Sequence, residues 1–480
     1  MQRSLPFLAL LALAATPAQA QPPLQVKVEA VLAQAPLGTR FGLLVVDEAG
    51  RELVAINPDS RFVPASNTKM FTTAAAYATP GVLDATAGTA IRLDGEGRRV
   101  PDVVLVGAGD ARLSSAKDCT VDCLATLADA VAARARLVGD VIGDDSLYPD
   151  ERWSPGMSWN NIPTRSGTAT SALTLDDNEL VMTVTPTMPG KPPIVDLPAY
   201  YALDNRATTG PAGGGDLDFT REPNGALVRL TGTIAADAKP ETIRLGIDDP
   251  ARYAAWVLRA MLEARGVRVT GKVDVRHRPL TAADDPVARG GAPAARPPVP
   301  APLATLPLPP LAEDVAITNK VSQNLHAELL LRRTGRMTGS GSIADGQAAV
   351  RAMLGQAGVG RTAYDFADGS GMSNYNRVAP RGAVGLLRWI AGQPWGAAWR
   401  ASLPIGGVDG TLSRRFRGTP LEGKLFAKTG TLNATNALSG WLTTASGRTL
   451  TFSAFANDVP EDGGATKAID AALLLIAAGT

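Results

Sequence analysis

Cysteine and histidine are scarce in this 480-residue chain, which has two residues of each. Cys119 and Cys123 have no histidine beside them, so their spacing does not indicate a zinc site. The two histidines argue against a Ser-His-Asp hydrolase, and no Gly-x-Ser-x-Gly elbow is present. We predict that His277 lies in a solvated loop and His326 on a helix face.

A surplus of charge of either sign is also missing. The chain has 47 Lys and Arg against 46 Asp and Glu, a formal net charge of +1. A nucleic-acid-binding protein needs a basic surplus to neutralise phosphates, so we expect no nucleic-acid partner. Hydrophobic residues make up 45% of the chain, enough for a sizeable core, and the length favours two to four domains.

Only the first residues of the chain contain a long apolar run, and no later run is long enough to span a bilayer. Arg3 precedes the apolar stretch 5–15, and Ala18-Gln19-Ala20 has the small-x-small pattern of a signal-peptide cleavage site. We therefore predict a signal peptide at residues 1–20, rather than a buried helix, and a mature start at Gln21. No Cys follows to carry a lipid, so we expect a free periplasmic or secreted protein without an integral membrane segment.

The sequence is compatible with two states of the cysteines, a disulfide and two free thiols. Export to an oxidising compartment favours a disulfide between Cys119 and Cys123. On a helical turn, however, a four-residue spacing would put their Cα atoms near the upper end of the separation that a disulfide allows. A disulfide and two free thiols are therefore both compatible with the sequence.

The first part of the chain predicts a hairpin followed by a helix. Two apolar strands, Phe41–Asp47 and Arg51–Asn57, flank a Glu-Ala-Gly turn. Pro64 then precedes an Ala-rich helix, Ser66–Ala78. From about residue 83 to 278, short strands alternate with Gly, Pro and Asp turns, with helices predicted at 123–135 and 253–265. We interpret this stretch as one or two mixed α/β domains.

The remaining part is predicted to be helical first and then to form strands. Arg289–Pro310, rich in Pro, Ala and Gly, is predicted to be a linker or an extended crossing. The expected elements that follow are helices at 311–333, 345–356 and 380–392, an antiparallel meander at 424–432, 437–444 and 448–457, and a closing apolar helix at 465–478.

Three short motifs carry residues suited to acyl transfer: Ser66-Asn67-Thr68-Lys69, Ser322-Gln323-Asn324 and Lys428-Thr429-Gly430. In the first, Ser66 and Lys69 share a helix face, and a lysine whose pKa is lowered by burial or by a nearby cation can activate a serine. The Ser66 backbone N–H, at the helix start, can point at a developing oxyanion.

The other two motifs supply supporting groups. On a loop between helices, Ser322 can relay a proton to the leaving amine, and Asn324 can hold both Lys69 and a substrate amide. On a strand, Lys428 offers a cation for a substrate carboxylate and electrostatic pressure on Lys69. Thr429 adds a hydroxyl donor, Gly430 lets a ligand backbone lie close, and the Thr431 N–H is a second oxyanion donor.

Each motif is weak alone, because the chain also contains Ser114-Ser115-Ala116-Lys117 and Ser158-Trp159-Asn160. Context separates them. Ser66 opens a helix behind Pro64-Ala65, and the apolar residues that follow it are expected to be buried. Ser114, in contrast, opens a polar turn. Lys-Thr-Gly occurs once, at the start of the predicted meander. The order and spacing of the three motifs together form a strong signal.

With these motifs the chain resembles the D-alanyl-D-alanine carboxypeptidase/endopeptidase family, the low-molecular-mass class C penicillin-binding proteins (peptidase family S13). The resemblance covers essentially the whole mature chain. Beyond the three motifs it rests on Asn319-Lys320-Val321, Ala327-Glu328-Leu329-Leu330, Asp368-Gly369-Ser370-Gly371 and Ala427 before Lys428. Met372-Ser373-Asn374 departs from the Leu-Ser-Arg that often follows in the family, and Gly107-Ala108-Gly109-Asp110-Ala111 departs from a common Gly-Gly-Asp-Pro turn.

The resemblance implies an α+β multidomain fold. A transpeptidase-like catalytic domain, with a five-stranded antiparallel sheet flanked by helices, would comprise residues 21–82 and 285–480, and residues 83–284 would form inserted mixed α/β domains, two in number. Ser66 would be acylated, Lys69 would be the base, Ser322 and Asn324 would support them, and Lys428 and Thr429 would bind the terminal carboxylate. Peptidoglycan stem peptides would be the substrates and β-lactams the acylating inhibitors, with no metal or cofactor.

Two other functions share parts of this pattern. A serine β-lactamase uses the same chemistry, but the long insertion favours the cell-wall enzyme. A catalytically inactive cell-wall-binding scaffold is the second alternative. A binding module has no need to keep the nucleophile Ser66 together with the base Lys69, which argues against it.

Overall fold

The two ends of the chain together form one five-stranded antiparallel sheet. The computed structural model describes residues 23–82, 84–95, 100–295, 300–460 and 463–480. The strand order is β19-β20-β21-β1-β2. The strands are β1 (Arg40–Val46), β2 (Glu52–Ile56), β19 (Leu425–Leu432), β20 (Thr435–Thr443) and β21 (Thr449–Asn457). The hairpin and the meander predicted from the sequence are thus neighbours in one sheet.

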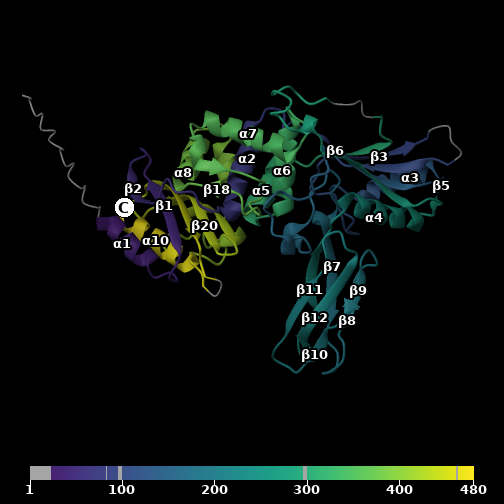
Figure 1. Ribbon diagram of the computed structural model, residues 1–480, viewed down its shortest axis with the longest axis horizontal. Coiled ribbons are helices and arrows are strands. Elements are labelled where there is room, and N and C mark those ends of the chain that lie inside the picture. Colours follow the sequence, from purple (N-terminus) through teal and green to yellow (C-terminus); the bar gives the residue numbers. More distant parts are fainter. Residues whose placement is uncertain (1–22, 83, 96–99, 296–299, 461–462) are drawn as a thin grey trace, which may run out of the picture.

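Helices cover both faces of this sheet, which explains why β20 and β21 are buried almost throughout rather than at alternate residues. Leu438 and Leu442 pack toward α1 and α10, and the intervening Trp441 packs toward the other helices. The helices are α1 (Pro23–Leu32), α2 (Thr68–Ala78), α5 (Leu311–Lys320), α6 (Asn324–Arg336), α7 (Ile343–Gln356), α8 (Pro380–Ala391), α9 (Gly396–Ala401) and α10 (Thr466–Gly479). We call the sheet and these helices the terminal unit (Figure 1).

A second five-stranded sheet lies beside the terminal unit, with the order β15-β6-β4-β3-β16. β4, β6 and β15 run parallel, and β3 and β16 are antiparallel to their neighbours. The strands are β3 (Ala87–Asp94), β4 (Asp102–Val106), β6 (Val141–Pro149), β15 (Val273–Arg278) and β16 (Ala304–Pro307). Helices α3 (Leu124–Arg134) and α4 (Pro250–Ala264) share its core, and the short strands β5 (Leu137–Val138) and β14 (Arg268–Val269) pair beside it. We call this the inserted unit.

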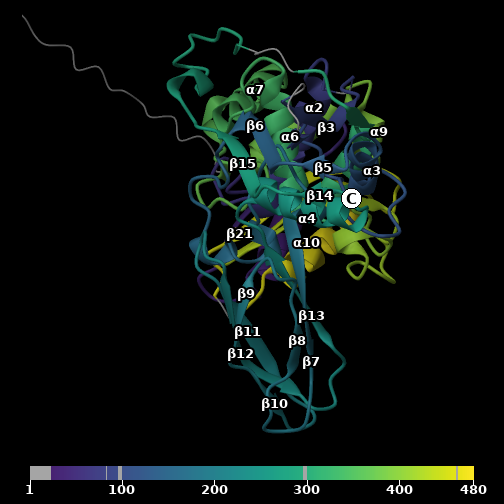
Figure 2. The ribbon, with the colours of Figure 1, turned by 90° about the vertical axis from the view of Figure 1, so that its right-hand side faces the viewer.

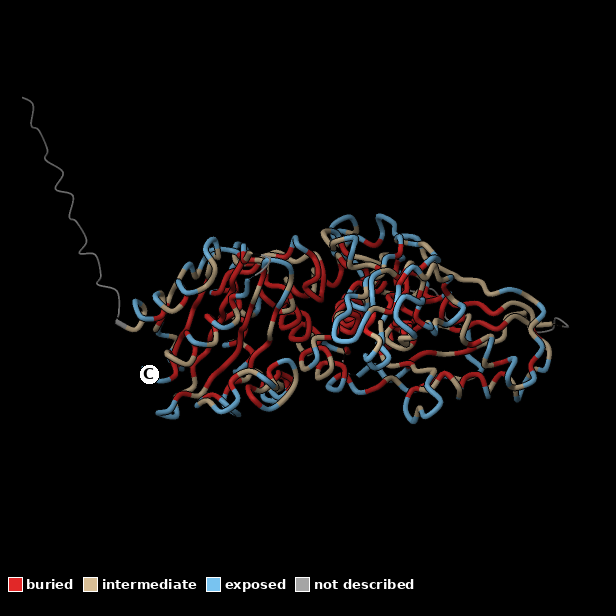
Figure 3. Tube along the Cα trace, turned by 90° about the horizontal axis from the view of Figure 1, so that it is seen from below, coloured by how far each residue is buried: buried red, intermediate tan, exposed pale blue. Residues whose placement is uncertain are grey.

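A third part, the β arm, projects away from the other two (Figures 1 and 2). One sheet has the order β13-β7-β8, and in the other β12 pairs with β9, β10 and β11. The strands are β7 (Glu179–Thr185), β8 (Ile194–Asp196), β9 (Ala202–Asn205), β10 (Thr208–Gly210), β11 (Asp216–Thr220), β12 (Leu227–Ala235) and β13 (Glu241–Gly246). Figure 3 shows buried segments along the five-stranded sheet of the terminal unit, with exposed residues mainly in the connections around it.

The α+β architecture with a five-stranded antiparallel sheet, expected from the motifs, is confirmed. One predicted helix is wrong: 311–333 is divided into α5 and α6 by a break at residues 321–323. The predicted linker 289–310 contains β16, which completes the sheet of the inserted unit through β3. The boundaries at 82/83 and 284/285 stay predictions, and the predicted signal peptide lies outside the described residues.

The two cysteines form a disulfide, with their Cα atoms 5.8 Å apart. Cys119 and Cys123 lie in the turn before α3, not on a helical turn, so the larger separation considered for a helix does not apply. Of the two states that the sequence left open, the structure contains the bonded one.

Candidate active site

Ser66 and Lys69 lie where a 3₁₀ turn, Ala65–Asn67, continues into α2. The predicted helix therefore begins with a tighter turn, and Ser66 is in that turn. Lys69 is fully buried and Ser66 is half-buried. Lys69 Nζ lies 2.8 Å from Ser66 Oγ, so the three-residue spacing brings amine and hydroxyl into contact.

The backbone just before Ser66 is strained. Ala65 has a φ of 48°, a left-handed value that is unfavourable for a residue with a side chain. Gly371, with a φ of 90°, packs against it: a Cβ at Gly371 would lie 1.9 Å from the Ala65 carbonyl oxygen. The glycine of the Asp-Gly-Ser-Gly motif is therefore needed to let this loop lie against the turn that carries Ser66.

Three acceptors surround the Lys69 amine. Its Nζ contacts Ser66 Oγ at 2.8 Å, Asn324 Oδ1 at 2.7 Å and the Ser370 carbonyl oxygen at 2.6 Å. An ammonium group would donate to all three. The neutral amine would donate to Asn324 and Ser370 and present its lone pair to the Ser66 hydroxyl. The site can thus hold both protonation states without moving a side chain.

Burial lowers the pKa of Lys69 from 10.5 to about 7, while the carboxylates of Asp368 and Glu328 act in the opposite direction. Burial also lowers the pKa of Lys428 well below its ordinary value, and here repulsion from Lys69 adds to the effect. The predicted pressure of Lys428 on Lys69 stays a prediction, and burial is the largest cause of the lowered pKa of Lys69.

The break between α5 and α6 places Ser322 in contact with Lys428 and Asn324 in contact with Lys69. Ser322 has a φ of 64°, so the helix cannot continue through it. Its Oγ accepts a hydrogen bond of 2.9 Å from Lys428 Nζ, while Asn324 accepts from Lys69. The break in the predicted helix 311–333 therefore puts Ser322 in a loop and Asn324 at the start of α6, and the two residues link both lysines.

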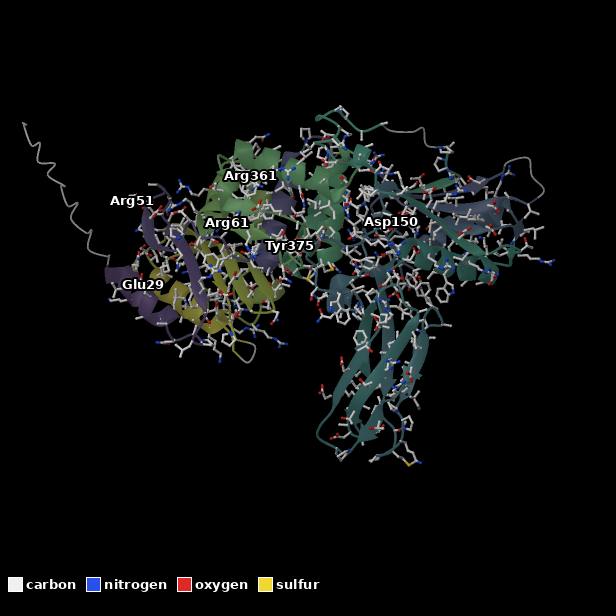
Figure 4. All side chains as sticks on the ribbon, viewed as in Figure 1. Glu29, Arg51, Arg61, Asp150, Arg361 and Tyr375 are labelled. Carbon is white, nitrogen blue, oxygen red and sulfur yellow. A yellow bond between two sulfur atoms is a disulfide. The ribbon has the colours of Figure 1, made fainter. Side chains whose placement is uncertain are left out.

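The inserted unit reaches this site through a 3₁₀ turn, Arg165–Gly167. Asn324 Nδ2 donates to the Ser166 carbonyl oxygen at 2.9 Å, so the amide of Asn324 is fixed at both ends. A second contact lies beside the Asp-Gly-Ser-Gly loop, where Asn374 N donates to the Gly156 carbonyl oxygen at 2.9 Å. Tyr375 follows, exposed, where the terminal unit faces the insertion (Figure 4).

β19 presents its outer edge to the site. Thr443 N donates to the Lys424 carbonyl oxygen on the β20 side, whereas Ala427 N donates away from β20, to Pro404. In an antiparallel ladder the amides alternate in direction, so the N–H groups of Thr429 and Thr431 point to the same outer edge as that of Ala427. Thr429 Oγ1 contacts Thr411 Oγ1 at 2.7 Å on the adjoining turn.

Gly430 has a structural reason within the protein, while its predicted role toward a ligand stays a prediction. A Cβ there would lie 2.7 Å from the Pro64 carbonyl oxygen and 3.1 Å from Asn67 Nδ2. Asn67 Nδ2 also donates to the Lys428 carbonyl oxygen at 3.0 Å. The glycine therefore lets β19 approach the turn of the nucleophile, so the close packing is against the protein's own backbone.

Sequence reasoning assigned no role to Glu328, Asp368 or Ser370, which complete the surroundings of Lys69. Glu328 and Asp368 are buried, and Ser370 provides a carbonyl acceptor. All three lie inside stretches on which the family resemblance rests, and this resemblance is the signal that could have identified them as site residues. Their distance along the chain from Lys69 concealed the contact.

Both histidines are partnered. The prediction of a solvated loop for His277 is wrong: it lies on β15, with Nδ1 2.9 Å from Asp145 Oδ1 and Nε2 3.4 Å from Asp249 Oδ2. These hydrogen bonds raise the pKa of His277 to about 10, against the opposing effect of burial. His326 is on α6, as predicted, but is buried, with Nε2 3.0 Å from Asp177 Oδ1.

The two further matches to the motifs, Ser114-Ser115-Ala116-Lys117 and Ser158-Trp159-Asn160, lie in the insertion. Ser114 and Ser115 hydrogen-bond Asp176, and Ser158 precedes a 3₁₀ turn, Trp159–Asn161. Within the described ranges, no group of three or more His, Cys, Asp or Glu side chains is placed to hold a metal ion. In the same residues, no helix combines the length and apolarity that crossing a membrane requires.

Comparisons with known proteins identify a family, relatives and a matching fold. The model of the D-Ala-D-Ala carboxypeptidase 3 (S13) family matches residues 24–479. A D-alanyl-D-alanine carboxypeptidase from Actinomadura sp. (strain R39) is 35% identical over 467 residues, covering 92% of this chain and 83% of the relative. The crystal structure of penicillin binding protein 4 (dacB) from Haemophilus influenzae has the same fold, with a TM-score of 0.78 at 23% identity, covering 94% of this chain and 97% of that one. The structure of that protein complexed with a β-lactam gives a TM-score of 0.73 at 22% identity, with the same coverage.

Proposed function

The chain belongs to the D-Ala-D-Ala carboxypeptidase 3 (S13) family and is a serine peptidase, and from that premise we propose that Ser66 is its nucleophile and Lys69 the general base. One observation carries this proposal: a fully buried lysine lies 2.8 Å from a half-buried serine hydroxyl. Near neutral pH a substantial share of Lys69 is the free amine, which is the form that can accept the Ser66 proton.

In the acylation step, Lys69 takes the hydroxyl proton as Ser66 Oγ attacks the carbonyl carbon of a D-alanyl-D-alanine-type peptide bond. The backbone N–H groups of Ser66 and Thr431 are the proposed donors to the oxyanion. The proton that Lys69 took is passed to the leaving amine through Ser322, which is hydrogen-bonded to Lys428, so that Lys69 is again a free amine. The C–N bond breaks and an ester on Ser66 remains, which water then hydrolyses with Lys69 again as base.

Lys428 and Thr429 are the proposed binding groups for the terminal carboxylate, and Gly430 keeps their strand close to the nucleophile. Burial disfavours the ammonium form of Lys428. An arriving carboxylate would restore that form, because an opposite charge in contact favours the charged state. Asn324, fixed between Lys69 and Ser166, is left with one N–H to offer a substrate carbonyl.

The proposed substrates are peptidoglycan stem peptides, and the proposed inhibitors are β-lactams that acylate Ser66. The name of the Actinomadura relative supports the first, and the β-lactam complex of the Haemophilus protein supports the second. Removal of a terminal D-Ala and cleavage of a cross-link break the same kind of bond, on the carboxyl side of a D-residue. Both activities are therefore proposed for one site.

Export to the periplasm or the medium is proposed on two grounds. The first twenty residues have the signal-peptide pattern, and the Cys119–Cys123 disulfide is typical of oxidising compartments. N-terminal sequencing of the protein recovered from the periplasm or medium is expected to begin at Gln21. Recovery in the cytoplasm with Met1 intact would contradict export.

The test of the chemistry is labelling of residues 21–480 with a fluorescent penicillin, in the parent and in Ser66→Ala. Stable label on the parent and none on the variant is the expected result. A folded parent that takes no label and leaves the antibiotic intact would indicate an inactive scaffold. Rapid loss of label with destruction of the antibiotic would indicate a β-lactamase.

A further inference from the structure

One face of α6 connects Lys69 to the inserted unit through three side chains. Asn324, Glu328 and Arg332 are spaced four residues apart and so share a face. Asn324 contacts Lys69, and Arg332 donates to Glu151 Oε2 of the insertion at 2.8 Å. Glu328, between them, is only 7% exposed, and the proposed reaction steps make no use of it.

Glu328 anchors the loop that holds Lys69. Its Oε1 accepts hydrogen bonds from Gly369 N at 3.0 Å and from Ser370 N at 2.8 Å. The carbonyl oxygen of that same Ser370 accepts from Lys69 Nζ at 2.6 Å. From the other side, Thr72 Oγ1 on α2 donates to the Gly369 carbonyl oxygen at 2.7 Å. The carboxylate thus fixes the residue on which the lysine rests.

The charged groups around Lys69 are few and lie on three elements. Lys428 on β19 repels it, while Asp368 in the loop and Glu328 on α6 attract its ammonium form. Asp368 is committed to its own loop, since it accepts from Gly371 N, Ser373 N and Asn376 Nδ2.

Glu328 is the carboxylate whose charge can change near neutral pH. Burial first, and then Asp368, raise its pKa to about 7, while Arg332 opposes them. Its ionisation therefore falls in the same pH range as that of Lys69. Loss of its negative charge removes part of the attraction that holds a proton on the lysine.

We propose that Glu328 is a positioning residue for acylation: it holds the Ser370 carbonyl against Lys69, and its charge sets the pH at which Lys69 becomes the free amine. The inference rests on the proposed role of Lys69 as base. Glu328 touches neither Ser66 nor the substrate in this scheme. It acts through the loop and through the electrostatic potential at the lysine.

The test is the pH dependence of the second-order rate constant for acylation by penicillin. Glu328→Gln keeps an oxygen acceptor for the two loop amides and removes the charge. The rate constant falls at acid pH as Lys69 becomes protonated. In Glu328→Gln this acid limb of the pH profile is expected to move to lower pH by about one unit, because Lys69 then loses its proton more readily. Glu328→Asp keeps the charge but withdraws it by one methylene, so its limb is expected to lie between those of the parent and Glu328→Gln.

Glu313→Gln is the matched control, because this exposed carboxylate on α5 pairs with Arg112 and does not face Lys69. Its limb is expected to coincide with that of the parent. An unmoved limb in folded Glu328→Gln overturns the inference, as does an equal shift in Glu313→Gln. If Glu328→Gln does not fold, an unmoved limb in Glu328→Asp overturns it. A parent that penicillin does not acylate at any pH refutes the proposed function instead, so the two failures are distinguishable.

Discussion

The terminal unit and the β arm each bury a cation, but with different partners. Lys69 and Lys428 are fully buried, and their hydrogen-bond partners are hydroxyl, amide and carbonyl oxygens. Arg221, only 3% exposed, instead donates to both oxygens of Asp248, at 2.5 and 2.6 Å. Its guanidinium also lies 4.7 Å from the centre of the Tyr201 ring.

The difference separates chemistry from structure. A buried ammonium group with neutral partners gives up its proton easily, and a base needs that property. A buried guanidinium paired with a carboxylate stays charged, and it secures the end of β13 against the β11–β12 connection. Removing Lys69 should lower the rate of catalysis, and removing Arg221 should lower the free energy of unfolding.

The largest expected effect is on catalysis. Lys69→Met should reduce the rate of acylation by penicillin by about 10²–10⁴-fold, because the base is lost. The loss of stability should stay below about 2 kcal/mol, since two neutral acceptors lose one donor. Stopped-flow acylation and urea unfolding measure the two quantities. Acylation within threefold of the parent, about the margin of an indirect effect, would contradict the assignment of the base.

The next largest effect is on stability. Arg221→Met should lower the free energy of unfolding by about 3–5 kcal/mol, because Asp248 is left buried and unpaired. The acylation rate of the folded protein should stay within about twofold of the parent, as expected for separate sites. The double variant Arg221→Met/Asp248→Leu serves as a control and should recover much of the loss. A large fall in the acylation rate of folded Arg221→Met would contradict the assignment of a purely structural role to this buried pair.

The terminal unit and the inserted unit should also respond to pH with opposite signs. Lys69 has a pKa of about 7 when folded and 10.5 ordinarily, so the unfolded chain binds more protons and stability rises with pH between these values. His277 has a folded pKa of about 10 against 6.5, so its contribution is fully present below 6.5 and is lost as pH rises toward 10. Thermal unfolding at several pH values should show a steeper rise in His277→Gln and a steeper fall in Lys69→Met. Identical pH profiles in all three proteins would contradict both signs.

The smallest expected effect concerns carboxylate binding. Thr429→Val should weaken kcat/KM for a D-Ala-D-Ala peptide by about tenfold, the cost of one hydrogen bond to a charged group. Thr411→Val, which removes only the hydroxyl that contacts Thr429, should have a smaller effect. Equal losses in the two variants would indicate that Thr429 supports the strand edge rather than the substrate.

Local patterns in the sequence predicted the parts of the site that are close in the chain. The three-residue spacing of Ser66 and Lys69 on a helix fixes their contact, and an apolar meander predicted the strand that carries Lys428. The hairpin and the meander followed from apolar runs at both ends of the chain, and their union in one five-stranded sheet was expected from the family resemblance. These features depend on neighbours within one element, so the sequence specifies them directly.

The rest depends on contacts between distant segments. The attraction of Glu328 and Asp368 for the Lys69 proton joins segments more than 250 residues apart, and no local pattern predicts it. The break at Ser322 overrides a helical pattern because tertiary contacts hold a left-handed residue there. His277, between Arg276 and Arg278 in the sequence, was likewise predicted to be solvated, but its carboxylate partners are Asp145 on β6 and Asp249 just before α4.

The most direct test of the account is the titration of Lys69 itself. With ¹³Cε-labelled lysine, the Lys69 resonance, assigned by its loss in Lys69→Met, should titrate with a midpoint of about 7. The matched exposed residue Lys272, whose pKa is raised by Asp274, should stay protonated throughout that range. A Lys69 midpoint near its ordinary value of 10.5 would contradict the claim that burial without an ion partner makes this lysine the base.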